Sequence, residues 1–174
     1  RSLGDLDIAI NVSPNQLRDG GFAQRVQAAL VRSRLDPTRL ELEITESVFL
    51  DDVEGALAQL DALRGLGVRV ALDDFGTGYS SLAYLRRFPF DTLKIDRAFV
   101  NELLLRADSK AIVRMMTQLA ATMGMRTVAE GVETPAQLGE VILAGCDEVQ
   151  GYLVSPPLAL AVLVNARQSA QAPA

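Results

Sequence analysis

The sequence predicts an α/β domain built on a parallel sheet, and two observations support this. Short apolar or β-branched runs alternate with longer segments of helical periodicity, giving six βα-type repeats along the 174 residues. Every apolar run also ends in a polar residue, as strands do when a functional rim lies at their carboxyl ends. The hydrophobic content of 49% suits one sizeable core.

The predicted elements follow one another in a regular order. Strands are expected at Asp7–Val12, Leu40–Thr45, Val68–Leu72, Thr92–Ile95, Arg126–Ala129 and Glu148–Val154. Helices are expected between most of them, at Gly21–Ser33, Asp51–Leu66, Ser109–Met123 and Pro135–Ala144. Glycines at or just after the ends of three of these helices, at 65 and 67, 124, and 145, are typical helix-ending turn signals. Strands that alternate with helices predict a parallel sheet covered by helices.

The composition excludes several classes of function. The chain has no histidine, which removes histidine-based acid–base catalysis and histidine-ligated zinc. A single cysteine, Cys146, excludes an internal disulfide. The net charge of −5 without a basic run argues against binding to DNA. No apolar run reaches the length of a membrane span and the start does not resemble a signal peptide, so we expect a soluble, cytoplasmic chain.

The polar residues at the strand ends form the candidate site. Six of them are carboxylates, two are amides and one is a lysine: Asn11, Glu43, Glu46, Asp73, Asp74, Lys94, Glu130, Glu133 and Gln150. Any one acidic residue here is most simply a helix N-cap, and Lys94 with Asp96 is most simply a surface ion pair. The same decoration on six successive strands is much harder to explain in this way. We therefore expect a common rim.

A bound cation is the simplest compensation for so many carboxylates. All-oxygen ligands select hard ions, so Mg²⁺ or Mn²⁺ is expected, or Ca²⁺ in a loose site. The adjacent pair Asp73 and Asp74 suits two ions, one carboxylate bridging them, and two ions are the usual device for attack of water on a phosphodiester. The residues predict a metal-dependent hydrolase of an anionic substrate, with sugar-phosphate lyases and enolase-like barrels as open alternatives.

Longer motifs carry a family resemblance. The stretches INVSPNQL, LELEITES, ALDDFGTGYSSLAYLRRFPFDTLKIDRAFV, TVAEGVET and GCDEVQGYLVSPPL, from about Asp7 to Leu158, resemble the EAL family of cyclic di-GMP phosphodiesterases. The resemblance implies a TIM-barrel-like fold and hydrolysis of cyclic di-GMP to linear pGpG with Mg²⁺ or Mn²⁺. It also implies bacterial second-messenger signalling.

The resemblance assigns roles by motif. Asn11 and Glu43 match ligands of the first metal, Asp73 the shared ligand and Asp74 a ligand of the second metal. Lys94 matches the lysine that holds the attacking water, and Glu130 the carboxylate that acts as general base or second-metal ligand. The remaining matches are supporting or substrate-binding positions, namely Glu46 for the DDFGTG loop, Glu133 near the nucleotide and Gln150 in the site.

Some family features are absent from this sequence. The Glu-Ala-Leu motif and the arginine after it are missing, so about the first two strands of the fold are lacking, and Pro156 stands where many members have a basic residue. We expect a partial EAL domain over residues 1–158 and a C-terminal helix with a frayed tail over 159–174. Such a piece alone is expected to be poorly stable and weakly active.

The family also suggests partners and an alternative function. Family members often dimerise next to the DDFG loop, where Phe75, Tyr79 and Tyr84 lie, although ordinary packing explains these aromatics equally well. Upstream domains in the same polypeptide are expected. The alternative is an inactive EAL module that binds cyclic di-GMP or a protein partner.

Overall fold

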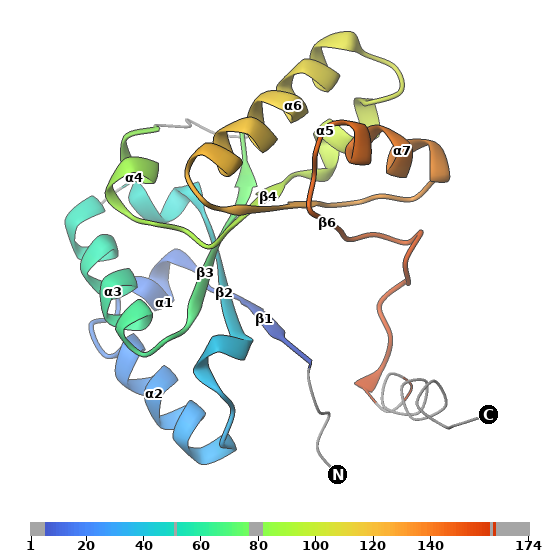
Figure 1. Cartoon of the computed structure of the whole chain (residues 1–174). Coiled ribbons are helices and arrows are strands. Elements are labelled where there is room, and N and C mark those ends of the chain that lie inside the picture. The colour runs from blue at the N-terminus through green and yellow to red at the C-terminus, as the bar shows by residue number, and fades with distance from the viewer. Residues whose placement is uncertain (1–5, 51, 77–81, 161, 163–174) are drawn as a thin grey trace.

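Six parallel strands form one continuous sheet in the described part of the chain, which comprises residues 6–50, 52–76, 82–160 and 162 of this computed structural model. The strands lie side by side in sequence order, each paired with its predecessor (Figure 1). They are β1 (Ile8–Asn11), β2 (Leu40–Thr45), β3 (Arg69–Phe75), β4 (Thr92–Ile95), β5 (Arg126–Ala129) and β6 (Glu148–Val149). The predicted α/β class is confirmed, and the first five strands lie where the alternation predicts them.

The sheet curls into a half-barrel with helices on its outer side (Figure 1). The longer helices are α2 (Phe22–Ser33), α3 (Val53–Gly65), α6 (Ala107–Thr122) and α7 (Pro135–Leu143). The shorter ones are α1 (Pro14–Arg18), α4 (Leu82–Arg87) and α5 (Arg97–Glu102), with 3₁₀ turns η1 (Pro37–Arg39) and η2 (Glu46–Phe49). All four long helices overlap predicted segments, whereas the short ones were not predicted because five or six residues carry too little periodicity.

Alternation along the strands separates an apolar layer from a polar one. On β2, Leu42 and Ile44 are buried in the core between sheet and helices, and Glu41 and Glu43 alternate with them in sequence. Successive strand side chains point to opposite faces, so the two glutamates lie on the inner, concave face. The core joins the outer faces of β2 to β5 to the helices, with Leu60, Leu63 and Leu93 fully buried. The polar residues of the strands are thereby directed to the concave side.

The carboxyl ends of two strands, β6 and β3, differ from the prediction by several residues. β6 ends at Val149 rather than Val154, because Gly151 packs so closely on Val132 that an added Cβ would lie 2.2 Å from its carbonyl oxygen. The chain there contacts a loop instead of a strand. β3 runs on to Phe75 through an irregular register against β4, and Asp74 adopts a positive φ of 55°.

Three further expectations concern the C-terminal segment, the aromatic residues near the DDFG loop and the absence of a membrane span. Most of the predicted C-terminal helix and tail, 159–174, lies outside the described residues. So do Tyr79 and the side chain of Tyr84, whereas Phe75 is buried in the core. Within the described residues, no helix has the length and apolar character required to cross a membrane.

Candidate active site

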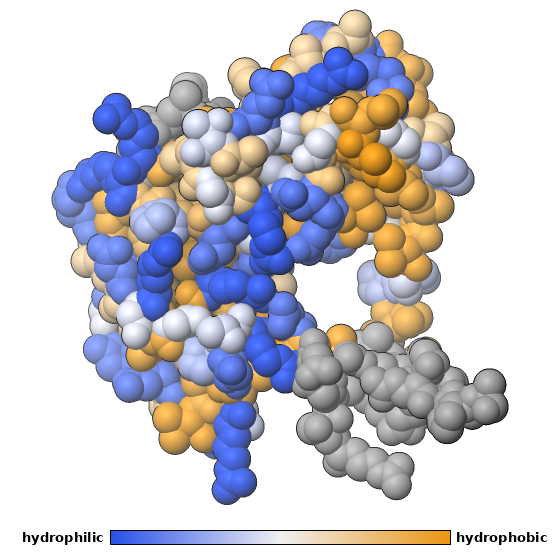
Figure 2. All heavy atoms as spheres, in the orientation of Figure 1, coloured by the Kyte–Doolittle hydropathy of each residue, from blue (hydrophilic) through white to orange (hydrophobic). Residues whose placement is uncertain are grey.

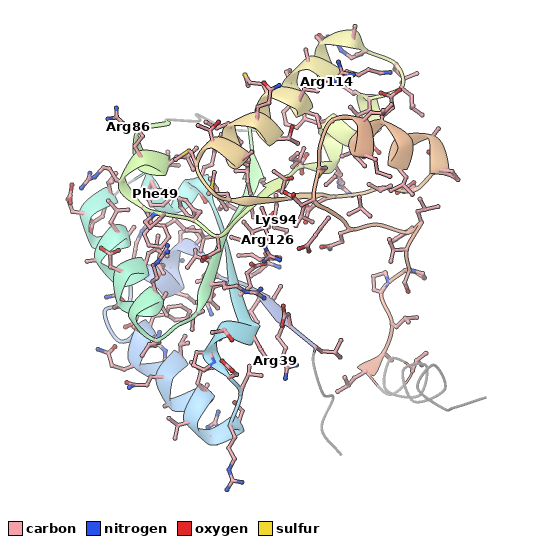
Figure 3. All side chains as sticks on the ribbon, in the orientation of Figure 1. Arg39, Phe49, Arg86, Lys94, Arg114 and Arg126 are labelled. Atoms are coloured by element: carbon pink, nitrogen blue, oxygen red, sulfur yellow. The ribbon has the colours of Figure 1, made fainter. Side chains whose placement is uncertain are left out.

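Lys94 lies at the centre of the concave face, on β4 (Figure 3). Its side chain is only 5% exposed, and its Nζ lies 2.7 Å from Glu130 Oε1, 2.9 Å from Glu43 Oε2 and 3.1 Å from Asp73 Oδ1. The three carboxylates come from the ends of three different strands, β5, β2 and β3. An ammonium group has three N–H donors, so these contacts match its full donor capacity.

The electrostatics of this cluster favour a charged lysine. Burial alone would lower the pKa of Lys94, but the hydrogen bonds to Glu130 and Glu43 and the attraction of Asp73 outweigh it and raise that pKa. Burial also raises the pKa of Glu130, and repulsion from Asp73 and Glu43 adds to this, against the opposing effect of Lys94. Lys94 is therefore a cation at neutral pH, and Glu130 is a carboxylate with an increased affinity for a proton.

Asp74 extends the acidic cluster beyond Lys94. Its pKa is raised by burial, by repulsion from Asp73 and by a hydrogen bond with Asp96. Carboxylate oxygens of Asp73, Asp74 and Glu130 all lie within 4.8 Å of one another. One cation at their centre could contact all three, and the all-oxygen donor set suits a hard divalent ion. The described residues thus fit a divalent metal at this position.

The other predicted site residues lie around this centre. Asn11 pairs in register with Glu43, and Asn11 is exposed at the end of β1. Gln150 is exposed just beyond β6 and lines the same cavity as Lys94 and Glu43. These residues share the concave rim with the lysine cluster.

Two predicted supporting residues lie further out. Glu46 is half-buried at the start of η2, but residues 77–81 of the loop it is predicted to support lie outside the described residues. Glu133 is exposed in the loop that follows Glu130. The roles of both residues stay predictions.

A cavity of about 300 Å³ occupies the concave face, and polar side chains gather there (Figure 2). Below the lysine cluster, towards the strand starts, it is lined by a chain of ion pairs that we term the charged belt: Asp7, Arg69, Glu41, Arg126 and Glu148. Arg69 bonds Asp7 at 2.7 Å, Arg126 bonds Glu148 at 2.6 Å, and Glu41 lies 3.9 Å and 3.6 Å from the two arginines. Thr92 Oγ1 donates to Glu41 at 2.8 Å.

Sequence reasoning did not identify the charged belt, although a signal for it exists. Each belt residue precedes a predicted site residue by two or four positions, as Glu41 precedes Glu43 and Arg126 precedes Glu130. In a strand this spacing means the same face. Residues two or four positions before a predicted site residue are therefore also expected on the concave face, nearer the start of the strand.

Comparison with known proteins identifies the family. The family model described as EAL domain matches residues 1–157. The chain belongs to the EAL domain family. The resemblance noted in the sequence is thus confirmed.

Curated relatives of this EAL domain are much longer proteins. It is 45% identical over 154 residues to the bifunctional diguanylate cyclase/cyclic di-GMP phosphodiesterase MucR of Pseudomonas aeruginosa, covering 88% of this chain and 22% of MucR. It is 42% identical over 158 residues to the cyclic di-GMP phosphodiesterase NbdA of the same species, covering 91% of this chain and 20% of NbdA. The chain spans about a fifth of the length of these relatives.

Solved structures agree with the half-barrel. The MucR phosphodiesterase in complex with c-di-GMP superposes with a TM-score of 0.88 at 43% identity, over 93% of this chain and 66% of that one. The EAL domain of Mycobacterium smegmatis DcpA gives a TM-score of 0.89 at 41% identity, over 96% and 75%. A manganese/cyclic di-GMP complex of Klebsiella pneumoniae BlrP1 gives 0.81 at 32% identity, over 87% and 39%. The curled sheet of this EAL domain is therefore the TIM-barrel-like fold of its family.

Proposed function

We propose that this EAL domain hydrolyses one phosphodiester bond of cyclic di-GMP to give linear pGpG, as part of bacterial second-messenger signalling. The observation that carries the proposal is the buried Lys94 ammonium held by Glu43, Asp73 and Glu130, with Asp74 alongside. The names of MucR, NbdA and the BlrP1 complex supply the substrate.

These carboxylates are proposed to hold two divalent cations, Mg²⁺ or Mn²⁺, which their clustered oxygens support. Asn11 and Glu43, neighbours across β1 and β2, are proposed for the first ion, and Asp73 for both. Asp74 and Glu130, whose oxygens cluster with Asp73, are proposed for the second. When bound, such ions polarise the phosphate and lower the pKa of water.

The protein side chains have separate tasks in the proposed reaction. Lys94 stays protonated, so it cannot accept a proton. Its three N–H donors face three carboxylates, and a metal ion that takes over one of these carboxylates would free an N–H for the attacking water or a phosphate oxygen. Glu130 is proposed either as a ligand of the second ion or as the general base. As a base, favoured by its raised pKa, it takes a proton from the water whose oxygen attacks phosphorus, while the bond to the sugar oxygen breaks and that oxygen takes up a proton. Gln150 and Glu133 are proposed to face the nucleotide, and Glu46 to support the DDFGTG loop.

The setting of the domain is also proposed rather than observed. We propose that residues 1–158 act as an EAL domain within a longer cytoplasmic polypeptide that has upstream domains. A homodimer through the DDFG-loop region is the proposed assembly.

The direct test measures pGpG formed from cyclic di-GMP by chromatography, with Mn²⁺ or Mg²⁺ and with EDTA, using the whole polypeptide that carries this domain. We expect product only with a divalent ion. Lys94→Met and Glu130→Gln should each reduce kcat at least about 100-fold, the usual effect of losing an electrostatic or acid–base group.

Lys110 provides a matched control. It is also a partly buried lysine in an ion pair, 2.6 Å from Glu140, but it joins α6 to α7 away from the site. Lys110→Met should retain normal turnover. Cyclic di-GMP that binds without turnover in the wild-type protein would instead support a non-catalytic binding module.

A further inference from the structure

The loop that follows β5 positions Glu130 relative to Lys94. Glu130 donates its backbone N–H to Ile95 at 3.0 Å, and Val132, which is fully buried, donates to Gln150 at 3.1 Å. Gly131 between them has a φ of +69°, and an added Cβ would lie 2.6 Å from the Cβ of Arg97 on α5. The loop is thus packed tightly against the helix that follows Lys94.

One buried side chain holds the far end of this loop. Gln137 on α7 is only 7% exposed, and its Oε1 accepts hydrogen bonds from the backbone N–H groups of Glu133 at 2.8 Å and Thr134 at 2.9 Å. Its Nε2 donates to Asn101 Oδ1, on α5, at 3.4 Å. A single amide therefore connects the Glu130 loop to the α5 helix that begins three residues after Lys94.

These contacts exceed those of an ordinary capping box. In that motif the third helical residue returns one hydrogen bond to the N-cap backbone. Gln16 on α1 does this, accepting from the Ser13 backbone at 3.0 Å, and Gln16 is exposed. Gln137 makes the corresponding bond to Thr134 and adds a bond to Glu133 and one to a neighbouring helix. The two additional hydrogen bonds hold the loop before α7 and connect it to α5, and they do not cap the first turn of α7.

We propose that Gln137 is a positioning residue for Glu130, acting through the backbone of Gly131 to Thr134. The proposal rests on the proposed function, because it assigns Gln137 the task of holding Glu130 in place for a divalent ion and for proton transfer. Partners that orient metal-ligating groups typically affect metal affinity or activity by about 10- to 100-fold. Gln137 never contacts the reacting atoms in this scheme.

The test compares three variants of the whole polypeptide by Mn²⁺ titration, followed by electron paramagnetic resonance, and by kcat at saturating Mn²⁺. Gln137→Leu removes all the amide's hydrogen bonds, and we expect about tenfold or greater loss in both measurements. Gln137→Glu keeps an acceptor for Glu133 and Thr134 and should restore most of both. Val141→Ala truncates a fully buried side chain on the same helix, so it lowers stability without changing the loop's bonds.

The outcomes separate this inference from the proposed function. Mn²⁺ affinity and kcat unchanged in Gln137→Leu, or reduced equally by Val141→Ala, would overturn the positioning role. Wild-type protein that binds Mn²⁺ but does not hydrolyse cyclic di-GMP would reject the proposed function, and the Mn²⁺ titration would still decide the role of Gln137. Wild-type protein that binds no Mn²⁺ would reject both.

Discussion

Lys94 is the residue whose environment departs most from a usual barrel interior. Barrel interiors are filled largely with branched apolar side chains, yet this position holds a buried ammonium among the carboxylates of Glu43, Asp73 and Glu130. Removing one partner from a buried ionic cluster leaves unpaired charge and costs more than the cluster contributes when intact. Lys94 therefore matters to stability as well as to the proposed chemistry.

The first prediction at this scale concerns Lys94→Met in EDTA. We expect the free energy of unfolding to fall by about 3 to 5 kcal/mol at pH 7, because three carboxylates lose their common cation. Mn²⁺ should recover part of the loss by taking over that charge. Urea unfolding with and without Mn²⁺ measures both effects.

The difference in free energy of unfolding between wild type and Lys94→Met should depend on pH in a definite direction. The pKa of Lys94 in the folded state lies above its ordinary value of 10.5, so its contribution to stability is complete below pH 10.5 and declines as the pH rises further. The gap between wild type and Lys94→Met should accordingly stay constant from pH 8 to 10 and narrow above that. A gap that widens at alkaline pH would contradict this account of Lys94.

The sequence predicted a common rim for these four residues because period-two alternation and strand ends determine which side chains share a face, and the structure brings the four together. It could not predict that Lys94 contacts three carboxylates at once, since this depends on the curl and register of the sheet. Nor could it predict the positive φ of Asp74, where the β3–β4 register shifts. A local pattern contains no information about either feature.

At the scale of elements, β6 shows how tertiary contact overrides a strand pattern. The run from Glu148 to Val154 has the composition of a strand, yet only two residues pair with β5. The remainder turns towards the Glu130 loop, where the Val132 and Leu153 backbones are joined at 3.0 Å and Gly151 packs directly on Val132. This packing holds Gln150 near the site.

Gly151→Ala should therefore be destabilising. Its new Cβ would meet the Val132 backbone, which cannot move without displacing the loop, and overpacking of this kind costs about 1 to 3 kcal/mol. Gly139→Ala is the matched control, since that glycine lies in α7 and a Cβ added there would meet no atom within 4 Å. The control should raise stability by about 0.5 to 1 kcal/mol through helix propensity. Melting temperatures measured by thermal unfolding test this, and a shift in the same direction in both variants would contradict the packing argument.

At the scale of the whole molecule, the charged belt joins strands from one end of the sheet to the other. It runs from Asp7 beside β1 to Glu148 on β6, through Arg69, Glu41 and Arg126. Glu41 is the best-buried member, with its side chain 13% exposed. The sequence predicted the parallel sheet, but not these links, because they join residues that are far apart in the chain.

Glu41→Ala should lower the free energy of unfolding by about 1 to 2 kcal/mol, because Thr92 loses its acceptor and both arginines lose a partly buried anion. The control is Arg87→Ala, which breaks a surface pair with Glu54 whose side chains are 47% and 77% exposed. That change should stay within about 0.5 kcal/mol. Equal losses in urea unfolding would show that the belt behaves as an ordinary set of surface pairs.

The belt also bears on how faithfully the sheet assembles. A strand that slips by one residue turns all its side chains to the opposite face. For β2, β3, β5 or β6 such a slip would place a glutamate or an arginine in the dry layer against the helices, where a charge without a partner is very costly. The charged side chains near the strand starts therefore favour the native register of the strands. A misaligned pairing therefore costs the burial of charge as well as the loss of apolar contacts.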